Sequence, residues 1–274
     1  MNRIILILTS LLLLSCSGHP RQESLTLISY NIGAFSKYQD NSIPGVAGLI
    51  LDNSADFVGL NELDSCNRRH DTFQLQALAE ELGGWQYHFA SAFPYAGGGY
   101  GNGVVTARPV TARYSIPLPK GDGAEARSVA VVETDVCVFA AVHLDHKGQT
   151  AALEQMKVVN QWFEKVYGGA RKPVFLCGDF NVTPDSEVIA EAETCWTLLS
   201  GENFTYSTTH PKSCIDYIFA LRDAAQVEVT GYEVLTEGTA ELSDHFPVKI
   251  TVRTWPRSGR RSSLPGIATP KPRE

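Results

Sequence analysis

The sequence predicts an α/β layered domain, and three observations carry this prediction. Short apolar runs bounded by turn residues recur along the 274-residue chain, as buried strands do. Between them lie segments in which apolar residues return every three or four positions, the spacing of amphipathic helices. Most of the apolar runs lead into carboxylate, amide or imidazole side chains, and α/β sheets carry their chemistry at strand ends. About 230 residues lie between an apolar N-terminal segment and a basic C-terminal tail, which suits one large domain.

Five apolar runs are predicted to be strands with polar tips. Residues 25–30 lead into Asn31, and residues 56–60 lead into Asn61 and Glu62. Residues 136–142 lead into His143, Asp145 and His146, and residues 173–177 lead into Gly178-Asp179-Phe180-Asn181. Residues 214–219 contain Asp216 and are followed later by Asp244 and His245. Asp179 and Asn181 lie two residues apart and therefore share one face, although both residue types also form ordinary turns. Taken together, these side chains can hold a hard cation and activate water.

Two helices are predicted between the strands. From residue 149 to residue 167, apolar side chains recur at helical spacing and form one buried stripe that ends at Gly168-Gly169. A shorter stripe from Leu75 to Leu82 ends at Gly83-Gly84.

The N-terminus predicts a secretion signal. Arg3 precedes a nearly unbroken apolar run from Ile4 to Leu14, which is too short to span a bilayer and fits a signal peptide. Leu13-Leu14-Ser15-Cys16 resembles a bacterial lipoprotein cleavage site, with residues 1–15 removed and Cys16 lipidated. A plain secretory signal with an incidental cysteine is the alternative. We expect a lipid-anchored protein of the cell envelope, facing the periplasm or the outside, with residues 16–24 as a short tether.

Charge is distributed unevenly along the chain. The formal net charge is −7, but residues 253–274 hold six basic residues and one acidic residue. Residues 16–252 therefore hold 16 basic and 29 acidic residues, which argues against non-specific binding of polyanions. The basic tail, residues 253–274, is rich in Pro, Ser and Arg and is predicted to be disordered. It is either a solvated end or a contact for anionic lipid.

Five cysteines follow Cys16, so at least one of them stays unpaired. Cys137 and Cys177 lie inside apolar strands and are predicted core residues. No Cys-x-x-Cys pair is present, which argues against a zinc or thioredoxin-like site.

The motifs, taken as a set, resemble those of the endonuclease/exonuclease/phosphatase superfamily. "GDFN" at 178–181, "IDYIF" at 215–219 and "SDHFP" at 243–247 occur in the order of that family, together with Asn31, Glu62 and His143. Residues 100–109, which read YGNGVVTARP, also resemble a sequence segment of this superfamily. The resemblance covers residues 25–252 and implies a four-layer α/β sandwich, two packed mixed β-sheets flanked by helices. Asn61 in place of a frequent Gln and Cys214 in place of a frequent Arg depart from the pattern and bear on substrate choice.

The resemblance also implies roles for the polar tips. Glu62, Asn31 and Asp244 would bind the cation, Mg²⁺ or Mn²⁺. His245 would be the general base, oriented by Asp216. Asp179 would position or polarise the attacking water, and Asn181 would donate to a phosphoryl oxygen. His143 would donate to another of those oxygens or help the leaving group.

Some polar residues near these motifs have less certain roles. Asn102 is expected to face the substrate or to support a residue that does. Asp145 and His146 suit a loop role equally well, and Arg68, Arg69 and His70 are expected in a solvated loop.

The sequence therefore predicts a metal-dependent phosphoesterase, a hydrolase in which water attacks phosphorus directly. Nuclease and sphingomyelinase-like lipid phosphodiesterase remain open as specific activities, and a non-catalytic binding protein on the same fold is the rival. The acidic body counts against long nucleic acid, whereas a membrane anchor counts for a lipid or a scavenged phosphoester. The expected partners of this monomeric chain are the phosphoester substrate and, through its anchor, a membrane.

Overall fold

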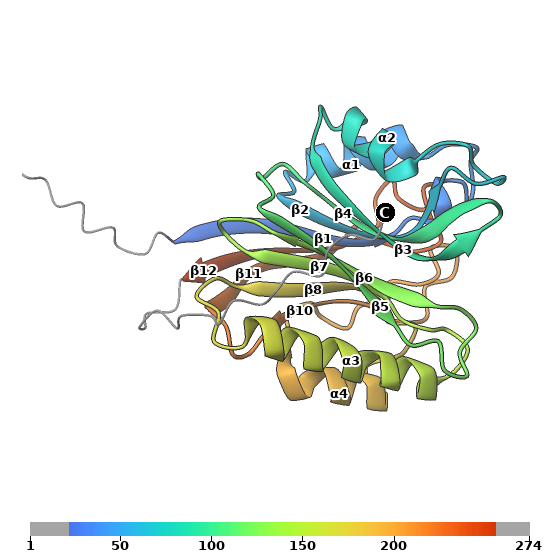
Figure 1. Cartoon of the computed structure of the whole chain (residues 1–274). Coiled ribbons are helices and arrows are strands. Elements are labelled where there is room, and N and C mark those ends of the chain that lie inside the picture. Colours follow the sequence, from blue (N-terminus) through green and yellow to red (C-terminus); the bar gives the residue numbers. More distant parts are fainter. Residues whose placement is uncertain (1–21, 256–274) are drawn as a thin grey trace, which may run out of the picture.

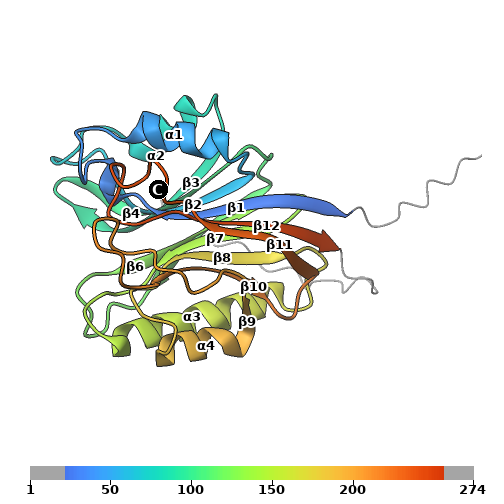
Figure 2. The ribbon, with the colours of Figure 1, turned by 180° about the vertical axis from the view of Figure 1, so that it is seen from behind.

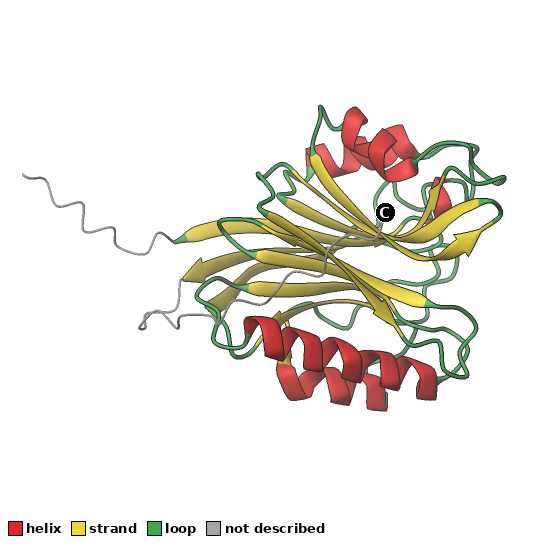
Figure 3. Ribbon diagram, viewed as in Figure 1, coloured by secondary structure: helices red, strands yellow, loops and turns green. Residues whose placement is uncertain are grey.

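Two six-stranded β-sheets pack face to face, and two helices cover the outer face of each sheet (Figures 1 and 3). The computed structural model describes residues 22–255. The first sheet has the order β11 (Gln226–Val234), β12 (Val248–Trp255), β1 (Glu23–Asn31), β2 (Phe57–Ser65), β4 (Gly98–Thr106) and β3 (Gln86–Tyr95). The second has the order β5 (Ala112–Leu118), β6 (Arg127–Glu133), β7 (Val138–His143), β8 (Val174–Asp179), β10 (Asp216–Leu221) and β9 (Trp196–Leu198). The predicted four-layer sandwich of two mixed sheets is confirmed.

Helices form the two outer layers, as the view from behind also shows (Figure 2). The first sheet is covered by α1 (Ile43–Asp52) and α2 (Gln74–Glu81), and the second by α3 (Gln149–Tyr167) and α4 (Glu187–Cys195). A short 3₁₀ turn, η1 (Gly33–Phe35), follows β1. Three buried apolar clusters fill the three interfaces between the four layers. The cluster between the sheets includes Leu27, Phe57, Phe139, Phe175 and Cys177.

Gly59 allows the two sheets to approach closely. A Cβ built on Gly59 would collide with Sγ of Cys177, which lies on β8 of the opposite sheet. This contact lies a few residues from the polar ends of both strands, so the close approach helps to set the distance across the site.

Strand direction gathers the polar residues at one end of the sandwich. β1 runs parallel to β2, and β7 runs parallel to β8, so four strands end at the same edge. β12 and β10 are antiparallel to their neighbours β1 and β8, and they begin at that edge. Asp179 at the end of β8 therefore lies in register with His143 on β7 and Asp216 on β10.

The predicted elements agree with the structure except in the following respects. α3 has the predicted bounds and α2 lies where predicted, but α1 and α4 were not predicted. β1 begins at Glu23, so the predicted tether of residues 16–24 is two residues too long. β12 continues to Trp255, so the predicted tail of residues 253–274 begins three residues too early. The predicted leader, Cys16 and the rest of the tail lie outside the described residues.

The cysteines and helices of the described chain add two facts. Cys66, Cys137, Cys177, Cys195 and Cys214 are all free thiols, and Cys137 and Cys177 are core residues as predicted. Within residues 22–255, no helix has the length and apolar character needed to cross a membrane.

Candidate active site

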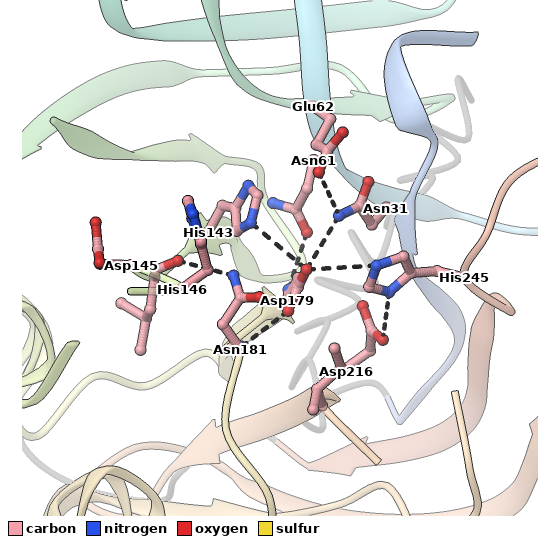
Figure 4. A network of polar contacts seen from close by, with 12 residues as sticks. Asn31, Asn61, Glu62, His143, Asp145, His146, Asp179, Asn181, Asp216 and His245 are labelled. Carbon is pink, nitrogen blue, oxygen red and sulfur yellow. Dashed lines mark hydrogen bonds and ion pairs between the residues drawn. The ribbon is translucent and has the colours of Figure 1, made fainter. Parts of the chain in front are cut away.

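Asp179 lies at the centre of the polar network (Figure 4). Its Oδ2 is 3.0 Å from Nδ2 of Asn31, 3.5 Å from Nε2 of His143 and 3.7 Å from Nε2 of His245. Its backbone N–H donates to Oδ1 of Asn61 over 2.9 Å. Burial and the negative charge of Asp216 raise the pKa of Asp179, whereas His245 and Asn31 act against that rise.

Gly178 lets Asp179 reach this position. Its φ of +146° lies in a region that favours glycine, and a Cβ there would collide with the carbonyl oxygen of Val142 on β7. That carbonyl oxygen accepts a hydrogen bond of 2.9 Å from Nδ2 of Asn61. β7 and β8 are thus held together at the point where both strands enter the site.

His245 and Asp216 form a buried pair beside Asp179. Nδ1–H of His245 donates to Oδ2 of Asp216 over 2.9 Å, and the two residues are 5% and 1% exposed. Burial alone would lower the pKa of His245, but the charges of Asp216 and Asp179 raise it above its ordinary value. Because Asp216 holds Nδ1–H and Nε2 faces Asp179, His245 is suited to accept a proton at Nε2.

Two loops hold His245 in place. Oγ of Ser243 donates to the backbone oxygen of Asn31 over 2.6 Å and accepts from the backbone N–H of His245 over 3.3 Å. The ring of Tyr206 lies on the imidazole, with centroids 4.8 Å apart. The ring plane and the position of His245 are therefore set by the end of β1 and by Tyr206.

Glu62 reaches the site from a β-bulge and not from a strand end. Leu60 pairs with Gly103 and Leu63 with Gly101, so two residues of β2 face one residue of β4. Glu62 has a φ of +62°, a bulge conformation that turns its side chain. The prediction that the strand ends before Glu62 is wrong because pairing with β4 continues β2 to Ser65.

The same bulge places Asn61 inside the molecule. Its Nδ2 donates to Oδ1 of Asn102 and to the oxygen of Val142, and its Oδ1 accepts from the N–H of Asp179. Asn61 thereby joins β2 of one sheet to β7 and β8 of the other. Asn102 lies behind Asn61, 2% exposed, and its Nδ2 donates to the oxygen of Ser128, a place that suits a supporting amide.

The three predicted metal ligands lie on one side of the network. Nδ2 of Asn31 donates to Oε1 of Glu62 over 3.2 Å, and Nζ of Lys37 lies 2.6 Å from Oδ2 of Asp244. Glu62 also acts electrostatically on Lys37 and raises its pKa together with Asp244, against the lowering effect of burial. A positive charge therefore already lies against Asp244 and within electrostatic reach of Glu62.

This donor set fits a hard divalent cation. Its carboxylate and carboxamide oxygens are the ligands of Mg²⁺ and Mn²⁺, and the ammonium of Lys37 shows that the carboxylates attract a cation. In its present orientation Asn31 turns its nitrogen toward Glu62, so an oxygen ligand requires the carboxamide to flip. One ligand atom from each of Asp179, Asp216 and His245 also lies within 4.8 Å of the other two, but Nδ1 of His245 is hydrogen-bonded to Asp216 and its Nε2 faces Asp179.

His143 and Asn181 complete the inner set. Nδ1 of His143 accepts from Nη1 of Arg127 over 3.1 Å, which leaves Nε2 facing Asp179. Asn181 has a φ of +56°, and its Nδ2 donates to the oxygen of Leu144 over 3.0 Å. An amide nitrogen carries two hydrogens, so one remains for a substrate oxygen.

Asp145 and His146 have separate roles. Asp145 is buried, and its carboxylate accepts from the backbone N–H groups of Ala124, Glu125 and Lys147, so it organises a loop. His146 is exposed, and its Nδ1 accepts from Nη2 of Arg127 over 3.1 Å.

The loop that holds Arg68, Arg69 and His70 is less free than expected. Arg69 donates twice to the buried carboxylate of Asp64, and Nδ1 of His70 lies 2.6 Å from Oδ2 of the same group. Arg68 and Arg69 are exposed as the sequence predicts, although Arg69 is bound to Asp64, and His70 is half-buried. Asp64 was not singled out in the sequence, because its partners come from a loop that folds back on β2.

Sequence reasoning also missed Lys37, Arg127 and Tyr206. Arg127 offered a signal, since it begins an apolar strand at the edge where the other polar tips gather. Lys37 and Tyr206 lie in loops whose path no local pattern predicts.

Comparison with known proteins now adds the family. The model for the endonuclease/exonuclease/phosphatase family matches residues 28–245. The chain belongs to this family. The matched region spans the network from β1 to His245, so the resemblance in the motifs is confirmed. A search of curated proteins by sequence returns no significant match.

Solved structures of the family have the same fold. A family protein from Bacteroides thetaiotaomicron matches with a TM-score of 0.66 and 21% identity, over 85% of this chain and 98% of that one. A mannosyl-6-phosphatase from the same organism has a TM-score of 0.66 and 22% identity, over 83% and 99%. ANGEL2, a 2′,3′-cyclic phosphatase, has a TM-score of 0.66 and 14% identity, over 86% and 98%. At these identities, the likeness shows the fold.

Proposed function

We propose that the protein is a divalent-cation-dependent phosphoesterase in which water attacks phosphorus directly. One observation carries the proposal: Oδ2 of Asp179 lies 3.7 Å from Nε2 of His245 and 3.5 Å from Nε2 of His143. These distances exceed a direct hydrogen bond, and the three groups converge, so that one small polar molecule lying beside them would contact all three. His245, backed by Asp216, would take the proton from that water.

The other residues supply binding and charge stabilisation. Asp179 orients the water, while His143 and Asn181 donate to phosphoryl oxygens as negative charge grows. Glu62, Asn31 and Asp244 would hold the cation. When bound, the cation would draw charge from the phosphoryl group and offset the site carboxylates, which favours the neutral form of His245.

Access to the site comes from its partly exposed members. Asn31, Asp179, Asp216, His143 and His245 are all at most 5% exposed. Glu62 and Asn181 are partly exposed, and the side chain of Asp244 is 13% exposed. A phosphoryl group would therefore approach on the side of Glu62, Asn181 and Asp244.

A substrate panel tests the proposal. Purified protein would be offered nucleic acid, sphingomyelin and other phospholipids, inositol phosphates and sugar phosphates with Mg²⁺ or Mn²⁺, and again with a chelator. We expect hydrolysis of at least one class, its loss on chelation and its return with added cation. Undiminished hydrolysis after exhaustive cation removal contradicts the metal dependence, and hydrolysis of none supports the non-catalytic binding protein.

We also propose that Cys16 is acylated and holds the mature protein at a membrane of the cell envelope. The support is the short apolar leader that ends at Leu13-Leu14-Ser15-Cys16. Stable attachment requires more than one acyl chain or a second contact. If a Cys16→Ser protein is processed and partitions as the parent does, the anchor is wrong.

A further inference from the structure

Arg127 contacts two histidines at the edge of the site. It begins β6, and its side chain is only 2% exposed. Nη1 donates to Nδ1 of His143 and Nη2 donates to Nδ1 of His146, both over 3.1 Å. Glu125 supplies the countercharge, with Oε2 at 3.5 Å from Nη2. One buried guanidinium thus donates a hydrogen bond to the Nδ1 atom of both imidazoles.

The chemistry of the guanidinium fixes the state of the buried ring of His143. A guanidinium stays charged and has only N–H donors, so a ring nitrogen bound to it must be an acceptor. The proton of the His143 imidazole must then be on Nε2, and that ring must be neutral. We propose that Arg127 is a positioning residue that holds His143 as the neutral Nε2–H tautomer, so that His143 presents a hydrogen-bond donor to a phosphoryl oxygen.

The groups around His143 agree with a neutral donor. Nε2–H faces Oδ2 of Asp179 at 3.5 Å, while the guanidinium of Arg127 lies on the opposite ring nitrogen. Burial, Arg127, His245 and His146 all lower the pKa of His143 well below its ordinary value. Asp179 is the charged group that opposes them. His143 therefore stays a neutral hydrogen-bond donor and does not take up a second proton.

His143 and His245 both face Asp179 through Nε2, but they differ in the charge of the group that Nδ1 contacts. Nδ1 of His245 faces a carboxylate, which favours a protonated ring. Nδ1 of His143 faces a guanidinium, which excludes a proton from that nitrogen. Environments that separate two titratable groups in this way divide acid–base work from hydrogen-bond donation.

Direct binding of a substrate by Arg127 is less well supported. Both terminal nitrogens already donate to imidazoles, and Nη2 also faces Glu125. The side chain is only 2% exposed, so little of its charged end is open to a substrate oxygen. The catalytic use of the tautomer rests on the proposed phosphoesterase activity, whereas the tautomer itself does not.

Nitrogen NMR of the substrate-free protein tests the tautomer. Nitrogen chemical shifts distinguish protonated from unprotonated ring nitrogens, and a His143→Gln variant assigns the signals. We expect Nε2–H and bare Nδ1 for His143 at pH 7. Arg127→Met should give a tautomer mixture and a higher pKa for His143, and Arg127→Lys, another donor-only cation, should restore Nε2–H. Arg113→Met, which removes a guanidinium from the neighbouring strand β5, is the matched control and should change neither property.

Kinetics then test the use of the tautomer. With a substrate from the panel, Arg127→Met should lower kcat by about tenfold or more and change KM less, because the donor acts on developing charge. A parent His143 with its proton on Nδ1 or on both nitrogens overturns the inference, and so does an Arg127→Met protein with unchanged tautomer and pKa. If Arg127→Met does not fold, the nitrogen spectra of the parent and of Arg127→Lys decide whether His143 is held as the Nε2–H tautomer. A protein that hydrolyses nothing but has the expected tautomer contradicts the proposed function alone.

Discussion

At the scale of single residues, the gap between Asp179 and His245 is the central feature. The 3.7 Å between Oδ2 and Nε2 is longer than a hydrogen bond, and both groups are buried. We place the attacking water beside these two groups, because the base and the orienting carboxylate would together fix it for reaction.

Asp216→Asn should lower the pKa of His245. Asp216 raises that pKa by stabilising the imidazolium, so replacing the carboxylate with a neutral amide removes the stabilisation. The measurement is an NMR titration of His245 in the cation-free protein. In the assay, the acid limb of turnover should move to lower pH. Asp185→Asn, an exposed carboxylate that contacts Thr183, is the control and should shift neither.

Glu62→Gln should weaken Mg²⁺ binding. The change keeps the shape of the side chain but removes one negative charge beside Lys37 and Asn31. Calorimetry should show a higher Kd, and excess cation should partly restore activity. Glu80→Gln on α2, an exposed residue, is the matched control. Equal Mg²⁺ affinity in Glu62→Gln and the parent would remove Glu62 from the ligand set.

At the scale of elements, the sequence predicted those parts whose pattern is local. The helix over residues 149–167 has a clear apolar stripe. Asp179 and His143 are the last residues of the apolar strands β8 and β7. α1 was missed because Ile43–Asp52 is apolar along most of its length and carries Pro44 and two glycines, which obscure its buried stripe of Ile43, Val46, Ala47 and Ile50.

The rest of the site depends on contacts between distant elements. The bulge at Glu62 exists because β4 pairs with β2 on both sides of it, and no local pattern encodes that pairing. Lys37 meets Asp244 across about 200 residues of chain because η1 and the loop before β12 meet at the same edge. Sequence motifs therefore predicted which side chains gather, but not Lys37, Arg127 or Tyr206 beside them.

Asp64→Asn should destabilise the fold at neutral pH. Burial would raise the pKa of Asp64, but hydrogen bonds from Arg69, His70 and Asn67 hold it below its ordinary value. The stabilisation is therefore present above the unfolded-state pKa of about 3.9 and is lost as pH falls through the folded-state pKa. We expect a loss of roughly 2 kcal/mol at pH 7 that shrinks toward pH 3.

Urea unfolding at the two pH values measures this difference. Asp71→Asn, an exposed carboxylate of the same loop, is the control and should have little effect at either pH. A loss for Asp64→Asn that is as large at pH 3 as at pH 7 would contradict the role of its charge.

At the scale of the whole molecule, the four layers explain why the site is rigid. Strands of both sheets contribute to it, and Asn61 joins β2 of one sheet to β7 and β8 of the other. Apolar clusters fill the interface between the sheets and those under the helices on either side. The backbone positions of the residues that would hold water, cation and phosphoryl group are therefore set before a substrate arrives.

The turnover of His245→Ala tests the central claim most directly. With the substrate found in the panel and saturating Mg²⁺, kcat should fall by about a hundredfold or more, because a positioned proton acceptor is lost. Mg²⁺ affinity measured by calorimetry should stay close to that of the parent, and His210→Ala, at an exposed position, should retain parental kcat. Parental turnover in His245→Ala would contradict the assignment and leave Asp179 as the base.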